Sequence, residues 1–211
     1  MFDYIIIPFL VHMTTYWSLS LLFYYIDLKY LDKNHNNWNK YGDAAKCSLI
    51  NMVTISLPIL YFTENYTIAA INRSVNDSYY MILFKVFIIG NMSNLLFYIF
   101  HRLLHTKLLF NTIHYKHHEF IEPIAVASLY AHPIEHIFAN TLSFLIPFHI
   151  VGVPYITMLI LLFFGTVTVI FSHIKYKTIY GNDHAIHHRL FKYNFGFASY
   201  LDKMLSTYKT I

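Results

Sequence analysis

Four apolar blocks constrain the fold of this chain more than any other feature of its sequence. A helix needs roughly 20 apolar residues to cross the hydrocarbon core of a bilayer. The blocks run from Tyr4 to Ile26, Cys47 to Phe62, Tyr79 to Phe100 and Ile137 to Ser172. Only 12% of the residues are charged, against about 25% in a typical soluble protein. We therefore expect an all-α fold, a multi-pass integral membrane helical bundle.

Prolines and one glycine modify two of these blocks. The second block is short and contains Pro58, which is typical of a thin crossing, a kink or a re-entrant segment. The fourth block is too long for one crossing, and "PFHIVGVP" interrupts it with Pro147, Gly152 and Pro154. These residues mark a turn, so we predict a helical hairpin. The third block continues into "HRLLH" without a breaker, so one helix should carry those histidines out of the bilayer.

Loop charges predict the orientation of the bundle. Lysine and arginine concentrate in cytoplasmic loops. The loop before the third block carries only Arg73, whereas the loop after the first block carries Lys29, Lys33, Lys40 and Lys46. We therefore predict that the first loop is cytoplasmic. Alternation of the crossings then places every histidine cluster on the cytoplasmic side.

Histidine spacing carries the main chemical prediction. Residues four apart on a helix share one face, so His101 and His105 of "HRLLH" can share a metal. Adjacent helical residues point about 100° apart, so a histidine triplet can offer ligands to two metals. "HYKHH" and "HAIHH" supply two triplets: His114, His117 and His118, then His184, His187 and His188. His132 and His136 are again four apart, and His173 follows the fourth block.

The number and type of these ligands predict two metal ions. Cys47 is the only cysteine, so a thiolate-based site is excluded. The histidines exceed what one ion needs, and imidazole suits zinc, copper, iron and nickel alike. Carboxylates are expected to orient the imidazole N–H groups rather than to bind metal. Four lie near the histidines: Glu119, Glu135, Asp183 and Asp202.

Simpler roles compete for some histidines. A single HxxxH on a helix is usually an accident, whereas three spaced clusters indicate a metal site. His132 either binds a metal or caps and braces the site through a hydrogen bond. His136 is assigned to the shell behind the ligands or to a structural role. Three histidines away from the clusters are interpreted as ordinary interfacial or loop residues: His12, His35 and His149.

The order HxxxH, HxxHH and a distant HxxHH resembles the fatty acid hydroxylase and sterol desaturase superfamily of membrane non-haem di-iron enzymes. "HYKHHEFIEPIAVASLYAHPIEH" is similar to the sterol 4-methyl oxidase and cholesterol 25-hydroxylase branch, and "HAIHHRLFKYNFGFASYLDKMLSTYK" to the closing pattern of the superfamily. The resemblance runs from about Asn91 to Lys209, with all three boxes in order. We therefore divide the chain into N-terminal membrane helices and loops, 1–90, and a catalytic region, 91–211, of one functional unit.

The resemblance implies a set of metal ligands. Eight of them match the boxes: His101, His105, His114, His117, His118, His184, His187 and His188. His132, in the HPxE element, and His173, at the position of the family's extra histidine, are added to this set. "HIKY" stands where the sterol-oxidising branch commonly has His-Ser-Gly-Tyr, and Ser206-Thr207 replaces Gly-Thr. These departures leave the substrate open.

The resemblance also implies an activity. Two iron ions activate O2, which attacks an unactivated C–H bond of a sterol or fatty acyl lipid. Electrons come from NAD(P)H through a reductase and usually cytochrome b5, and the membrane is expected to be the endoplasmic reticulum. The small net charge of +4 gives no indication of nucleic-acid binding.

Two other classes of protein remain open. A membrane metal-binding or transport protein would place ionisable ligands along a path within the spans, and an inactive descendant would serve as a scaffold. The sequence leaves hydroxylation, desaturation and methyl oxidation undistinguished, as well as the oligomeric state.

Overall fold

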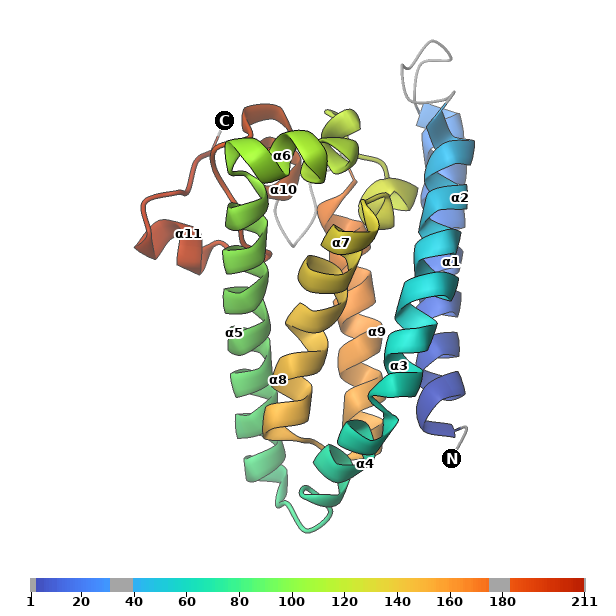
Figure 1. Cartoon of the computed structure of the whole chain (residues 1–211), viewed down its shortest axis with the longest axis vertical. Helices are drawn as coiled ribbons and strands as arrows, with labels where there is room; N and C mark the ends of the chain where they lie inside the picture. Colours follow the sequence, from blue (N-terminus) through green and yellow to red (C-terminus); the bar gives the residue numbers. More distant parts are fainter. Residues whose placement is uncertain (1–2, 31–39, 175–182, 211) are drawn as a thin grey trace.

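The computed structural model describes residues 3–30, 40–174 and 183–210 as an upright bundle of long helices (Figure 1). His35, Lys33 and most of the stretch between His173 and His184, including half of "HIKY", lie outside the described residues. Within the described ranges, five helices are long and apolar enough to cross a membrane. They are α1 (Asp3–Tyr30), the run Tyr41–Phe62, α5 (Tyr79–Leu104), the run Pro133–Val151 and α9 (Tyr155–Ser172). The predicted all-α membrane bundle is confirmed.

Two of the five crossings contain a π-helical segment. The second crossing joins α2 (Tyr41–Asn51), a π-helical segment (Met52–Ser56) and α3 (Leu57–Phe62) without a break. Pro58 lacks the N–H that would bond to the carbonyl of Thr54, and the wider π turn accommodates this loss. The fourth crossing joins α7 (Pro133–Glu135), a second π-helical segment (His136–Leu142) and α8 (Ser143–Val151). The short second block therefore forms a 22-residue helix of spanning length.

The predicted hairpin has a later turn than the sequence indicated. Pro147 lies inside α8, and the helix ends only at Gly152. Gly152 has a φ of 71°, and a Cβ there would collide with the carbonyl oxygen of Ala70. Glycine is the residue that tolerates both conditions. The turn before α9 therefore depends on Gly152 and Pro154, and Pro147 is accommodated within the helix.

The two ends of the bundle differ in structure (Figure 1). Of the short helices in the described ranges, α4 (Glu64–Asn72) lies at one end. The other carries α6 (Lys107–Thr112), 3₁₀ helices His114–Glu119 and Ala125–Leu129, α10 (Asp183–Leu190) and α11 (Tyr200–Met204). The C-terminal end of α1 and the N-terminal end of α2 lie at this second end as well. Three of the basic residues that predicted a cytoplasmic loop, Lys29, Lys40 and Lys46, are therefore on the same side as the histidine segments.

Polar side chains of the membrane helices hold the 3₁₀ helix Ala125–Leu129 in place. Tyr16 on α1 donates to the carbonyl of Val126 at 2.7 Å. Asn51 donates to the carbonyls of Leu129 at 3.2 Å and of Ala131 at 3.0 Å. These bonds satisfy carbonyls that the short helix leaves free, as buried carbonyls require. The segment between the second histidine box and the HPxE element is thus packed against the bundle.

Candidate metal centre

Nine histidines converge at the end of the bundle that carries the short helices. They form two groups, and within each group the nearest ring nitrogens all lie within 4.8 Å of one another. The first group is His101, His105, His114, His118 and His187, and the second is His117, His173, His184 and His188. The groups adjoin, because the ring centres of His118 and His188 are 4.6 Å apart.

Each group draws histidines from several elements. His101 occupies the last turn of α5 and His105 is its C-cap residue, so the long helix delivers both to the first group. His173 is the C-cap residue of α9 and supplies the second group. On α10, the adjacent residues His187 and His188 point about 100° apart and enter different groups.

The box "HYKHH" is a 3₁₀ helix rather than the α-helix assumed from its spacing. His114 and His118 nevertheless enter the first group, and His117 enters the second. The tighter helix directs adjacent side chains about 120° apart, since it has three residues per turn. The triplet therefore still divides between the two groups.

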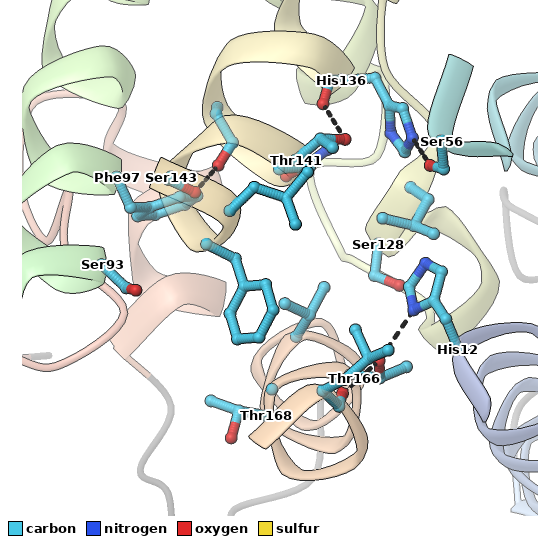
Figure 2. Close-up of a pocket in the computed structure, with 18 of the residues that line it drawn as sticks. His12, Ser56, Ser93, Phe97, Ser128, His136, Thr141, Ser143, Thr166 and Thr168 are labelled. Atoms are coloured by element: carbon cyan, nitrogen blue, oxygen red, sulfur yellow. Dashed lines mark hydrogen bonds between the residues drawn. The ribbon is translucent and has the colours of Figure 1, made fainter. Parts of the chain in front are cut away.

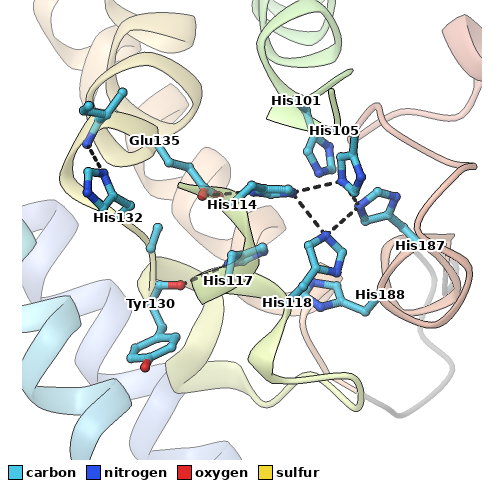
Figure 3. A network of polar contacts seen from close by, with 12 residues as sticks. His101, His105, His114, His117, His118, Tyr130, His132, Glu135, His187 and His188 are labelled. Carbon is cyan, nitrogen blue, oxygen red and sulfur yellow. Dashed lines mark hydrogen bonds and ion pairs between the residues drawn. The ribbon is translucent and has the colours of Figure 1, made fainter. Parts of the chain in front are cut away.

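In the first group, four ring nitrogens form a closed ring (Figure 3). The Nε2 atoms of consecutive members lie 3.0 to 3.2 Å apart, in the order His105, His114, His118, His187 and back to His105. Nε2 of His101 is buried beside them without a hydrogen-bond partner among the described residues. Five nitrogens are therefore directed at one small space.

Backbone carbonyls behind the rings determine which nitrogen carries the proton. Nδ1 of His101 lies 2.6 Å from the carbonyl oxygen of Phe195, and Nδ1 of His187 lies 2.6 Å from that of Tyr193. A carbonyl can only accept, so each Nδ1 carries the hydrogen and each Nε2 of a neutral ring carries a lone pair. Nδ1 of His114 lies 2.9 Å from a carboxyl oxygen of the buried Glu135, without the geometry of a hydrogen bond.

The second group follows the same pattern. Nδ1 of His117 lies 3.2 Å from the carbonyl oxygen of Tyr130, and Nδ1 of His173 lies 2.8 Å from that of Val169. Their Nε2 atoms are 3.1 Å apart, so two lone pairs face each other. His184 and His188 continue the series at 3.1 and 3.2 Å. Facing lone pairs repel one another unless a cation lies between them.

These residues fit metal ions by their chemistry and by their spacing. Imidazole nitrogens bind zinc at about 2.0–2.1 Å, which places ligand nitrogens about 3.4 Å apart at tetrahedral angles and about 3.0 Å apart at right angles. The observed separations of 3.0 to 3.2 Å lie near the right-angle value. The nitrogens of the first group are therefore close enough together for one metal ion to be bound by several of them.

Of the four predicted carboxylates, Glu135 lies against a histidine of the groups. The carboxyl of Glu119 accepts a hydrogen bond from the Tyr130 hydroxyl at 3.1 Å. Burial raises the pKa of Asp183, whose carboxyl pairs with Tyr208. Asp202 holds the backbone of Phe195 and Gly196. We expected carboxylates to orient the rings. Instead, backbone carbonyls face Nδ1 in four of the nine histidines.

His132 and His136 lie outside both groups within the described structure. Nδ1 of His132 accepts from the backbone N–H of Ile134 at 3.2 Å, so His132 caps α7 (Figure 3). Nε2 of His136 lies 2.8 Å from the Ser56 hydroxyl. These positions agree with the capping role considered for His132 and with the structural role considered for His136. His149, at the other end of the bundle, has its Nε2 3.0 Å from the Thr67 hydroxyl.

An apolar cavity leads from the metal centre into the membrane part of the bundle. His101, His114, His117, His173 and His184 line one part of it, and side chains of all five membrane-spanning helices line most of the rest. Figure 2 shows that His12 also faces this cavity. The sequence interpretation treated His12 as an ordinary interfacial or loop residue, whereas the structure places it on the cavity wall within a membrane-spanning helix, where an ionisable residue is costly.

Comparison with known proteins identifies the family. The fatty acid hydroxylase family model matches residues 86–207, more than half of the chain. The chain belongs to the fatty acid hydroxylase family. The match includes every histidine of the two groups, and no solved structure matches the chain.

Curated relatives in the fatty acid hydroxylase family include lipid monooxygenases. Human fatty acid hydroxylase domain-containing protein 2 is 29% identical over 173 residues, which are 80% of this chain and 52% of that protein. Methylsterol monooxygenase 1 of Gallus gallus is 31% identical over 60% of this chain and 46% of its own length. Sphinganine C4-monooxygenase 1 of Arabidopsis thaliana is 26% identical over 96% and 84%. This chain spans about half the length of the first of these relatives.

Acidification should remove metal from this member of the fatty acid hydroxylase family only well below pH 6.5. Burial lowers the pKa of His117 from 6.5 to about 4, and burial together with neighbouring histidines lowers that of His187 and His188 far below 6.5. The unfolded chain therefore takes up protons between pH 6.5 and 4 that the folded chain does not. Each such histidine costs about 1.4 kcal/mol of stability per pH unit of acidification.

We expect full metal content and thermal stability at pH 6.5 and above, and loss of both as the pH falls toward 4. Elemental analysis after desalting, and thermal unfolding at each pH, measure the two quantities. Half-loss of metal close to pH 6.5 would contradict the burial of these rings.

Proposed function

We propose that this chain is a membrane-bound oxidoreductase that uses O2 and externally supplied electrons to hydroxylate, oxidise or desaturate a C–H bond of a lipid. One observation carries the proposal: two adjoining sets of inward-facing Nε2 lone pairs stand at one end of an apolar cavity. A cavity bounded by membrane-spanning helices suits a lipid that enters from the bilayer. Membership of the fatty acid hydroxylase family supports the same reaction class.

The nine histidines of the two groups would hold two iron ions. Iron bound there would supply the activation of O2 for attack on a C–H bond. The chain contributes the orientation of the ligands, because carbonyls of Phe195, Tyr193, Tyr130 and Val169 hold their rings. We leave His132 out of the ligand set, because its ring caps α7.

The histidines also exclude water from the site. Eight of the nine are buried, and His105 is partly exposed. Phe195 and Phe110 pack on the His105 ring, with centres 5.2 and 5.4 Å away. A dry site prevents side reactions of a strongly oxidising centre with solvent.

The proposed function also includes an electron source, a membrane and an orientation in that membrane. We propose that electrons arrive from NAD(P)H through a reductase and cytochrome b5, at the cytoplasmic face of the endoplasmic reticulum. The lysine-rich ends of α1 and α2 lie on the same side of the bundle as the histidine groups, which supports this orientation. The family resemblance supports the donor.

Lipid mass spectrometry tests this function directly. Cells that express the wild type should contain an oxygenated sterol, a hydroxylated acyl chain or a new double bond that is absent with His117→Ala. The purified wild type should contain about two irons per chain, as expected of a two-metal site. Stoichiometric zinc with unchanged lipids would contradict the proposal and favour a metal-binding protein. Retained iron without any lipid product in the presence of a donor would favour a scaffold.

A further inference from the structure

His12 forms a polar site inside the cavity that the metal centre does not use. It lies on α1 within the first membrane crossing, and its Nδ1 is 2.8 Å from the Thr166 hydroxyl on α9 (Figure 2). Both residues line the same cavity as His101, His114 and His117. A histidine at this depth is costly unless it has a function.

The hydrogen-bond pattern leaves Nε2 of His12 open as an acceptor. The Thr166 hydroxyl donates to the carbonyl of Leu162 at 2.8 Å, so its oxygen accepts from Nδ1–H of His12. Nε2 of the neutral ring then carries a lone pair, and it has no hydrogen-bond partner among the described residues. Thr141 and Thr168 donate to the carbonyls of His136 and Phe164, whereas the hydroxyls of Ser93 and Ser128 in the same cavity have no hydrogen-bond partner among the described residues.

The position of the pair along α9 sets its depth. Thr166 precedes His173, a histidine of the second group, by seven residues. At 1.5 Å per helical residue, the pair lies about 10 Å from that end of the helix. The open acceptor and the metal centre are therefore two separate points in one cavity.

We propose that the cavity binds a lipid alcohol whose hydroxyl donates a hydrogen bond to Nε2 of His12. This inference rests on the proposed function, since it specifies the substrate class of the same cavity. The hydroxyl and the oxidised carbon of the lipid then lie at different depths, with about 10 Å of helical rise between Thr166 and His173. His12 acts as a positioning residue, because it determines which carbon reaches the metal centre.

A lipid without a hydroxyl would leave this acceptor unpaired inside the cavity. An acceptor that is left unpaired when the lipid binds lowers the affinity about tenfold or more. A simple acyl chain has no donor in its hydrocarbon part, so it would incur this loss. The geometry thus favours sterols and long-chain alcohols over simple acyl chains.

Equilibrium binding to the metal-loaded protein in detergent tests the inference. The probes are cholesterol with cholesteryl methyl ether, and octadecanol with octadecyl methyl ether. Each ether keeps the oxygen and loses the donor. We expect the wild type to bind at least one alcohol about tenfold more tightly than its ether, the loss expected for one hydrogen bond. The pair that shows the preference identifies a sterol or a long-chain alcohol as the source of the hydroxyl.

Variants assign this preference to His12. His12→Phe should bind alcohol and ether equally, and His12→Gln, which retains an acceptor, should restore part of the preference. Thr166→Val should weaken the preference because it removes the partner of Nδ1. Thr168→Val is the matched control, because its hydroxyl bonds only within α9, and it should keep the wild-type ratio. Metal content confirms that each variant is folded.

The inference is overturned if neither pair shows a preference in the wild type, or if His12→Phe keeps that preference while Thr166→Val also leaves it unchanged. Binding and turnover separate the two proposals. A normal alcohol preference without lipid oxidation would contradict the proposed function alone. Lipid oxidation without an alcohol preference would contradict the role of His12 alone.

Discussion

Alanine in place of His117 or His118 is expected to abolish lipid oxidation, while each change removes metal from a different group. The two residues are adjacent on the 3₁₀ helix His114–Glu119. His118 contacts His114 and His187 in the first group, whereas His117 contacts His173 in the second. Each variant should therefore fall from about two metal ions per chain to about one. Lipid oxidation should be lost in both variants, because a two-metal mechanism requires an ion in each group.

Elemental analysis and lipid mass spectrometry on the same preparations measure this result. His132→Asn is the control, because asparagine can still cap α7 and His132 lies outside both groups. It should keep both metals and the lipid product. Two metals retained in either alanine variant would show that the groups are not the metal sites. Metal loss in His132→Asn would return His132 to the ligand set.

Apolar block lengths predicted the membrane helices well because block length is a local property. A run near 20 residues has few other stable environments than a bilayer. The continuation of the third block into "HRLLH" was also confirmed, since α5 ends at Leu104 and carries His101 in its last turn. The prolines were the weak point. Pro58 and Pro147 both lie within helical crossings, because π turns and neighbouring helices absorb the lost hydrogen bond.

Spacing alone could not identify the partners behind the histidines. Four of the rings contact the backbone carbonyls of Phe195, Tyr193, Tyr130 and Val169. Every residue carries a carbonyl, so the sequence contains no signal for one in particular. Carboxylates were the visible candidates, and Glu135 alone of the four lies against a histidine of the groups in the described structure.

Long-range packing also determined the role of His12. Its partner Thr166 is 154 residues away in the sequence, and neither residue belongs to a recognisable motif. The cavity that both line exists only once α1 and α9 pack together. The depth of His12 inside an apolar block was the available signal, and it was weaker than the histidine boxes.

Asp202→Asn is expected to destabilise the protein and to weaken metal binding together. The fully buried carboxylate accepts from the backbone N–H groups of Phe195 and Gly196 at 2.8 and 2.9 Å, and from the Thr207 hydroxyl at 2.8 Å. Asparagine would place an N–H₂ donor against one of these N–H donors. The loss of stability should be about 3 kcal/mol, the upper range for a buried group left unsatisfied.

Metal binding should follow because Asp202 acts through the backbone. The loop that it holds presents the carbonyl of Phe195 to Nδ1 of His101. Loss of such an outer partner typically weakens metal affinity by about 10- to 100-fold. Thermal unfolding and chelator competition measure the two effects.

Asp183→Asn makes the same chemical change at a control position. Asp183 is only partly buried, and its carboxyl pairs with Tyr208 rather than with the loop at Phe195. It should lose less than about 1 kcal/mol, as expected of sites away from buried networks. Equal losses in both variants would contradict the role of Asp202. Reduced metal affinity in Asp202→Asn at full stability would instead show that the loop orients His101 without contributing to the fold.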